Sequence, residues 1–168
     1  MRIGLLSDTH GWIHPRLREF FKDVDEIWHA GDIGDAATAD KLASYKQLRA
    51  VHGNIDGAEL RRMYPADLHL DIEGKKIWIR HIGGYPGHYE PHVRQALITD
   101  PPDIFICGHS HIARVIFDRK MNLLYINPGA AGYSGFHKVM TAVRFTIDKD
   151  GIHSLELIEL GERGRVEA

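Results

Sequence analysis

The chain has almost no cysteine: Cys107 is the single one among 168 residues. One thiol cannot form an internal disulfide, which is compatible with a reducing cytoplasm, where we expect the protein to be. Long apolar runs are absent as well, since no stretch approaches the roughly 18 apolar residues of a membrane span. The amino-terminal segment loses its apolar character after Leu6. We therefore expect neither a signal peptide nor a membrane partner.

An excess of charge of one sign is also lacking. The chain has 21 Lys and Arg against 23 Asp and Glu, a formal net charge of −2. This balance gives no reason to expect a general affinity for nucleic acid, which would be bound only as a substrate. The length fits one domain with its own core, so we expect residues 1–168 to form a single domain. Histidine, by contrast, is abundant with 12 residues, which favours imidazole and oxygen ligands over thiolates.

The first half of the chain alternates short apolar runs with helical patterns. Strands are predicted at 1–6, 26–30 and 47–52. Leu17, Phe20, Phe21 and Val24 recur at helical spacing and predict a helix over 14–24. A second helical stripe follows Asp35, a suitable N-cap. Alternating strands and helices predict an α/β fold with parallel strands joined by crossover helices.

The second half has a different pattern. The turn sequence "EGK" between residues 68–72 and 76–81 predicts a β-hairpin. A helix is predicted from about residue 91 to 98, leading to a strand at 103–107. The remaining segments predict strands in antiparallel ribbons, at 113–118, 123–127, 140–147 and 153–159.

Polar side chains recur where the predicted strands end. All are oxygen or imidazole donors, and each lies close in sequence to glycine or another small residue. Because ligands bind at the carboxyl ends of the strands in such sheets, we expect these side chains to converge on one edge. They are Asp8, His10, Asp32, Asn54, His81, His109 and His111.

Each donor has a structural alternative when it is taken alone. Asp32 suits the N-cap of a helix, Asn54 suits a turn, and His81 suits a buried core position. The whole set, in this order at successive strand ends, is improbable by chance. The set therefore favours a metal site.

The motifs resemble those of the calcineurin-like metallophosphoesterases, which carry D-x-H, G-D, G-N, a lone histidine and G-H-x-H in that order. Here they read "DTH", Gly31–Asp32, Gly53–Asn54, His81 and "GHSH". The chain is most similar to the small bacterial and archaeal phosphodiesterases of that family. The resemblance implies a sandwich of mixed β-sheets flanked by helices, in the layer order αββα.

The resemblance also implies two divalent metal ions: manganese, iron or zinc, with manganese favoured. The first ion would be bound by Asp8, His10 and His111, the second by Asn54, His81 and His109, and Asp32 would bridge both. Asp8, Asp32 and Asn54 would then be catalytic, and a hydroxide between the ions would attack phosphorus in line. Ligating histidines must be neutral, so we expect activity to fall below about pH 6.5.

One position departs from the family pattern. Many larger relatives carry a histidine after the G-N asparagine, matched to acid catalysis, and this chain has Ile55. His88, in the loop after His81, is a candidate substitute acid or phosphate contact; the alternative is a solvated loop histidine. Tyr85 and Tyr89 in the same loop are candidates to stack on a base or an aryl leaving group.

Three functions remain open from the sequence. The leading one is a phosphodiesterase acting on a small phosphoester. The presence of Ile55 favours this function over a phosphomonoesterase. A phosphomonoesterase would use the same ions. A partner-binding scaffold of this fold, like the retromer subunit, would not need the complete ligand set. Exposed hairpins also suggest a homodimer.

Overall fold

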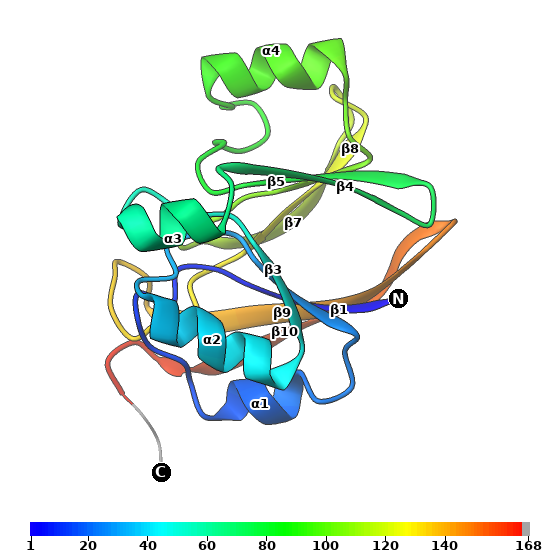
Figure 1. Ribbon diagram of the computed structural model, residues 1–168. Coiled ribbons are helices and arrows are strands. Elements are labelled where there is room, and N and C mark those ends of the chain that lie inside the picture. Colours follow the sequence, from blue (N-terminus) through cyan, green and yellow to red (C-terminus); the bar gives the residue numbers. More distant parts are fainter. Residues whose placement is uncertain (166–168) are drawn as a thin grey trace.

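Two five-stranded β-sheets pack face to face in the computed structural model, which describes residues 1–165 (Figure 1). The strands are β1 (Arg2–Leu6), β2 (Glu26–His29), β3 (Gln47–Ala50), β4 (Asp67–Ile72), β5 (Lys75–Arg80), β6 (Ile104–Ile106), β7 (Ala113–Asp118), β8 (Leu123–Pro128), β9 (Val139–Asp148) and β10 (Gly151–Glu162). The helices are α1 (Arg16–Phe20), α2 (Ala36–Tyr45), α3 (Ala58–Met63) and α4 (Pro91–Thr99).

The first sheet has the strand order β10-β9-β1-β2-β3. Strands β1, β2 and β3 are parallel, with Leu5 opposite Trp28 and Trp28 opposite Arg49. This confirms the predicted parallel arrangement of the first half. Strands β9 and β10 come from the end of the chain and extend the sheet on the other side of β1 by antiparallel pairing.

The second sheet has the order β4-β5-β6-β8-β7 and is mixed. The predicted β4–β5 hairpin is present, with Ile72 opposite Lys75. The predicted antiparallel ribbon is correct for β7 and β8, but β8 also pairs in parallel with β6. Strand β7 connects β6 to β8 and lies at the edge, so β8 returns in the direction of β6.

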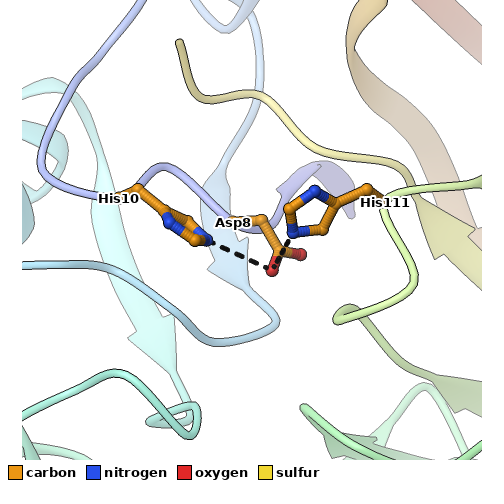
Figure 2. Close-up of side chains that lie close together, drawn as sticks. All are labelled: Asp8, His10 and His111. Atoms are coloured by element: carbon orange, nitrogen blue, oxygen red, sulfur yellow. Dashed lines mark hydrogen bonds and ion pairs between the residues drawn. The ribbon is translucent and has the colours of Figure 1, made fainter. Parts of the chain in front are cut away.

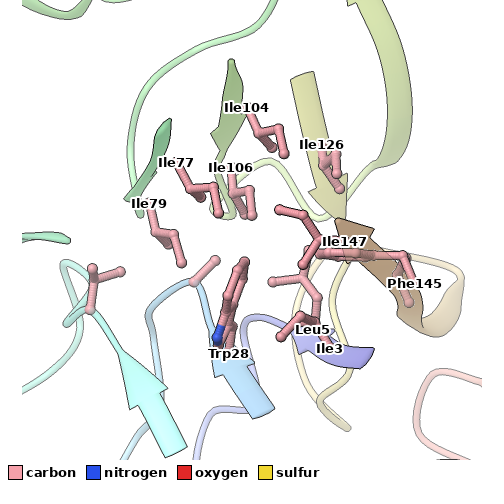
Figure 3. Close-up of a cluster of buried hydrophobic side chains, with 13 residues drawn as sticks. Ile3, Leu5, Trp28, Ile77, Ile79, Ile104, Ile106, Ile126, Phe145 and Ile147 are labelled. Carbon is pink, nitrogen blue, oxygen red and sulfur yellow. The ribbon is translucent and has the colours of Figure 1, made fainter. Parts of the chain in front are cut away.

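The main core lies between the two sheets (Figure 3). Ile3 and Leu5 of β1 and Trp28 of β2 face the isoleucines of the second sheet, Ile77 and Ile106 among them, and all are almost fully buried. The outer faces are covered by helices, α1 and α2 on the first sheet and α4 on the second (Figure 1). The resulting layer order is the predicted αββα, held together by apolar burial on both faces of each sheet.

Two helices differ from the prediction. Helix α1 ends at Phe20, although Phe21 and Val24 beyond it are buried in the same apolar cluster. Helix α3 was not predicted. None of the helices formed by residues 1–165 has the length and hydrophobicity needed to cross a lipid bilayer.

Candidate metal centre

The structure gathers six of the predicted ligands into two groups of donor atoms, one of which is drawn in Figure 2. Within each group the ligand atoms lie within 4.8 Å of one another. The groups are Asp8, His10 and His111, and Asp32, His81 and His109. They correspond to the two sets expected from the resemblance, with Asn54 still to be placed.

Asp8 is fully buried and its two oxygens have different partners. Oδ2 accepts hydrogen bonds from the Ser7 hydroxyl at 2.6 Å and from the His109 backbone N–H at 3.1 Å. Oδ1 is directed at imidazoles, 3.1 Å from His111 Nε2 and 3.7 Å from His10 Nε2 (Figure 2). One oxygen is therefore held by the protein and the other is available to a cation.

Asp32 faces both groups. Its Oδ1 accepts a hydrogen bond from the Ile55 backbone N–H at 3.1 Å. Its Oδ2 lies 3.5 Å from His10 Nε2 and 3.2 Å from His81 Nε2. A single carboxylate oxygen is thus shared by one imidazole of each group, which is the arrangement that a bridging ligand needs.

The donor set fits divalent metal ions. The Nε2 atoms of His10 and His81 are buried and lack a hydrogen-bond partner within residues 1–165. Buried polar atoms without partners are rare, and a bound cation is one explanation for them. The His81 ring is already oriented, because its Nδ1 lies 2.8 Å from the carbonyl oxygen of Ala30 and must donate to it. In the neutral ring, Nε2 is therefore left with a lone pair for a cation.

The electrostatics keep both carboxylates ionised. Burial alone would raise the pKa of Asp8, but the contacts with His10 and His111 outweigh it and hold that pKa well below its usual range. The pKa of Asp32 is likewise lowered, because His10 and His81 outweigh the effect of burial. In return, Asp32 and Asp8 raise the pKa of His10 to about 9. A cation must displace a proton to bind His10.

The backbone at the site adopts an unfavourable conformation. Among residues 1–165, eight non-glycine residues have positive φ, and five of them are predicted ligands. Such conformations persist where the surrounding structure enforces them, and they cluster at functional sites. The five ligands are Asp8 (54°), His10 (50°), Asp32 (57°), His109 (67°) and His111 (60°).

The motif glycines leave room for neighbouring ligands. A Cβ on Gly31 would lie 2.6 Å from the His81 ring, and one on Gly53 would lie 2.0 Å from Asp32 Oδ1. A Cβ on Gly108 would lie 2.1 Å from the Ser7 hydroxyl that holds Asp8. In each of the G-D, G-N and G-H motifs, the glycine therefore allows another ligand-bearing segment to approach.

Asn54 lies on the turn that follows β3, and its side chain is exposed. The next residue, Ile55, donates its backbone N–H to Asp32, so the turn adjoins the second group. The Ile55 side chain is 48% exposed beside it. The structure thus places the turn that carries Asn54 beside Asp32, and the role of Asn54 as a ligand stays a prediction.

The loop after β5 carries the other predicted residues. His88 is exposed, and its ring packs against Tyr85 with the centroids 4.9 Å apart; its catalytic role stays a prediction. The Arg114 guanidinium lies over the Tyr85 ring, with its Cζ atom 5.5 Å from the ring centroid. The expected stacking role of Tyr89 is wrong, because Tyr89 is buried in the core and its hydroxyl donates to Asp118 at 2.8 Å.

Several supporting residues were missed from the sequence. Asp56 is buried and accepts hydrogen bonds from the backbone N–H groups of Ile33, Gly34 and Gly53, which joins the turns after β2 and β3. Its one signal in the sequence is its place in the turn "GNIDG". His137 contacts His111 and lies on the loop after the buried strand β8. It belongs to no sequence motif.

Comparison with known proteins agrees with this geometry. Residues 1–150 match the calcineurin-like phosphoesterase superfamily domain. The probable metallophosphoesterase of Methanocaldococcus jannaschii is 32% identical over 138 residues, which cover 77% of this chain and 68% of that protein. A probable metallophosphoesterase of Methanothermobacter thermautotrophicus is 29% identical over 139 residues, covering 77% of each chain.

Solved structures share the fold. A single mutant of Vps29 from Entamoeba histolytica has a TM-score of 0.75 at 15% identity, covering 95% of this chain and 99% of its own. A protein described as a novel archaeal phosphodiesterase has a TM-score of 0.71 at 23% identity, with the same coverage of both chains. The match over residues 1–150 identifies the family: the chain belongs to the calcineurin-like phosphoesterase superfamily of metal-dependent hydrolases.

Proposed function

We propose that the protein is a dinuclear metal-dependent phosphodiesterase that hydrolyses a small phosphoester. The position of Asp32 carries this proposal. Its Oδ2 lies within 3.5 Å of His10 Nε2 in one ligand group and of His81 Nε2 in the other. A carboxylate shared in this way supports two ions close together rather than one.

The first ion would be held by Asp8, His10 and His111, the second by Asn54, His81 and His109, and both by Asp32. The nitrogen and oxygen donors favour manganese, iron or zinc, and manganese is our choice for assays. When bound, two divalent ions supply positive charge for an anionic phosphate and lower the pKa of water.

The side chains of the protein have separate tasks. The Ser7 hydroxyl and the His109 backbone fix Asp8 Oδ2, so the carboxylate cannot rotate away from its histidines. Ile55 stands beside Asp32 and has no proton to give to a leaving group. A general acid is worth about 10²–10⁴-fold, so the site favours substrates whose leaving group departs without protonation. Activated diesters meet this requirement, and the archaeal phosphodiesterase of the same fold supports the choice.

The proposal is tested by comparing two substrates with the same leaving group. Manganese-loaded protein is given bis(4-nitrophenyl) phosphate or 4-nitrophenyl phosphate, each with and without a chelator. We expect chelator-sensitive hydrolysis and a larger kcat/KM for the diester. Asp32→Asn serves as the control for contaminating phosphatases, because it removes the shared carboxylate without changing the shape of the side chain.

Each other outcome has a clear meaning. A larger kcat/KM for the monoester would overturn the substrate class and make the protein a phosphomonoesterase. No hydrolysis of either substrate with two ions bound would overturn the enzymatic proposal in favour of partner binding.

A further inference from the structure

His137 is a buried histidine next to a predicted metal ligand, on the loop of residues 129–138 between β8 and β9. Its side chain is 7% exposed. Its ring packs edge-on against His111, with the centroids 5.1 Å apart and the Nδ1 atoms 3.2 Å apart. Its other nitrogen, Nε2, lies 2.8 Å from the carbonyl oxygen of Gly132. Both nitrogens of His137 therefore have a partner.

The loop is fixed against the metal centre. The Gly132 backbone N–H donates to the Asp8 carbonyl oxygen at 3.1 Å. A Cβ on Gly135 would lie 2.5 Å from His111 Nδ1, so glycine is required where the loop passes over that ring. Arg163 Nε donates to the His137 carbonyl oxygen at 2.8 Å. These contacts determine where the His137 ring can lie.

The positions of the protons follow from the partners. A carbonyl oxygen only accepts, so His137 Nε2 must carry a proton to bond to Gly132. His111 Nε2 points at Asp8 Oδ1, 3.1 Å away, and must present a lone pair there to bind an ion. A neutral His111 then carries its proton on Nδ1. Only one proton fits between the two Nδ1 atoms, so His111 donates and His137 accepts.

We propose that His137 is a positioning residue that holds His111 in the Nδ1-protonated tautomer and orients its Nε2 towards the first ion. The proposal rests on the metal centre of the proposed function, but not on the substrate. His81 is oriented in the same way by the carbonyl oxygen of Ala30. A backbone carbonyl thus orients His81 in the second ligand group, and the imidazole of His137 orients His111 in the first.

Two variants separate acceptance of the hydrogen bond from packing. His137→Phe keeps a ring but has no acceptor, whereas His137→Asn loses volume but places an oxygen near the position of Nδ1. The affinities of both metal sites are measured by competition with a chromophoric chelator. Loss of a residue that supports a ligand typically weakens metal binding by about 10–100-fold. We expect that loss in His137→Phe, at the first site alone, and affinity close to wild type in His137→Asn.

A spectroscopic measurement on the wild-type protein needs no variant. In the zinc-loaded protein, nitrogen NMR of the histidine rings should show His111 protonated on Nδ1 and His137 protonated on Nε2. A proton on His137 Nδ1 would overturn the proposal. So would equal weakening of both sites in His137→Phe, or no weakening at all. Because these readouts need no hydrolysis, they remain informative if the phosphodiesterase proposal fails.

Discussion

Mild acid should destabilise the metal-free protein through His29, which lies under the Asp8–His10 turn. The His29 ring is completely buried. Its Nδ1 accepts a hydrogen bond from the Gly31 backbone N–H at 3.1 Å, so a neutral ring carries its proton on Nε2 and donates to the Thr9 hydroxyl at 2.9 Å. That hydroxyl donates onward to the Ile33 carbonyl oxygen at 2.9 Å. Protonation of Nδ1 would break the bond to Gly31.

The size of the effect follows from the pKa. Burial lowers the pKa of His29 from 6.5 to about 4. Between about pH 4 and pH 6.5, His29 is therefore protonated in the unfolded chain and neutral in the folded chain. The stabilising contribution is complete above about pH 6.5 and is lost as the pH falls towards about 4. At about 1.4 kcal/mol per pKa unit, acidification from about pH 7 to about pH 4.5 should remove about 2 kcal/mol from the free energy of unfolding.

The assay is urea unfolding in the presence of a chelator at these two pH values, for the wild type and His29→Gln. We expect the wild type to lose about 2 kcal/mol more than the variant on acidification. Burial also lowers the pKa values of His14 and His137, but both residues are present in both proteins and their contributions cancel. An equal loss of stability in the two proteins would refute the reasoning.

Four further predictions concern the metal centre. Asp32→Asn should weaken both metal sites, measured by metal titration. The control variant Asp40→Asn, on the exposed face of α2, should weaken neither. Weakening of one site only in Asp32→Asn would exclude a bridging role. Ile55→His should speed the hydrolysis of diesters with alkyl leaving groups by up to about 10²-fold, because a poor leaving group needs a proton. The rate of hydrolysis of 4-nitrophenyl diesters should change little. An equal change in both rates would argue against an acid role for the introduced histidine. The predicted role of His88 requires that His88→Ala slow the hydrolysis of the same alkyl diesters, and unchanged turnover would remove His88 from the mechanism. Metal at about 100 times its dissociation constant should add about 2.7 kcal/mol per site to the free energy of unfolding. Chelation should therefore lower the Tm measured by calorimetry. An unchanged Tm would contradict specific binding to the folded state.

Much of the fold could be predicted because its signals are local. The apolar runs of β1 and β2 are each followed by a glycine-containing turn, and such runs indicate buried strands. Helix α3 gave little signal, because Leu60 is its one buried residue. The parallel pairing of β6 with β8 depends on a return of the chain through β7, which no local pattern encodes.

The candidate ligands could also be found from the sequence, because each follows a strand. The expected single sheet edge was wrong: Asp8, His10, Asp32 and Asn54 follow strands of the first sheet, whereas His81, His109 and His111 follow strands of the second. The residues that support them could not. His29 and His137 act through contacts with segments 20 and 26 residues away, and a lone histidine has no pattern. Tyr85 and Tyr89 are equivalent in the sequence, yet one is exposed and the other bonds to Asp118 in the core. Only tertiary packing distinguishes them.

The proposed function requires that one site hold two ions and use both for hydrolysis. Manganese is added stepwise to chelator-treated protein, and bound metal and hydrolysis of bis(4-nitrophenyl) phosphate are measured in the same samples. We expect turnover to rise with the second ion and to reach its plateau at two ions per chain. Full turnover with one ion per chain, or none with two, would contradict it.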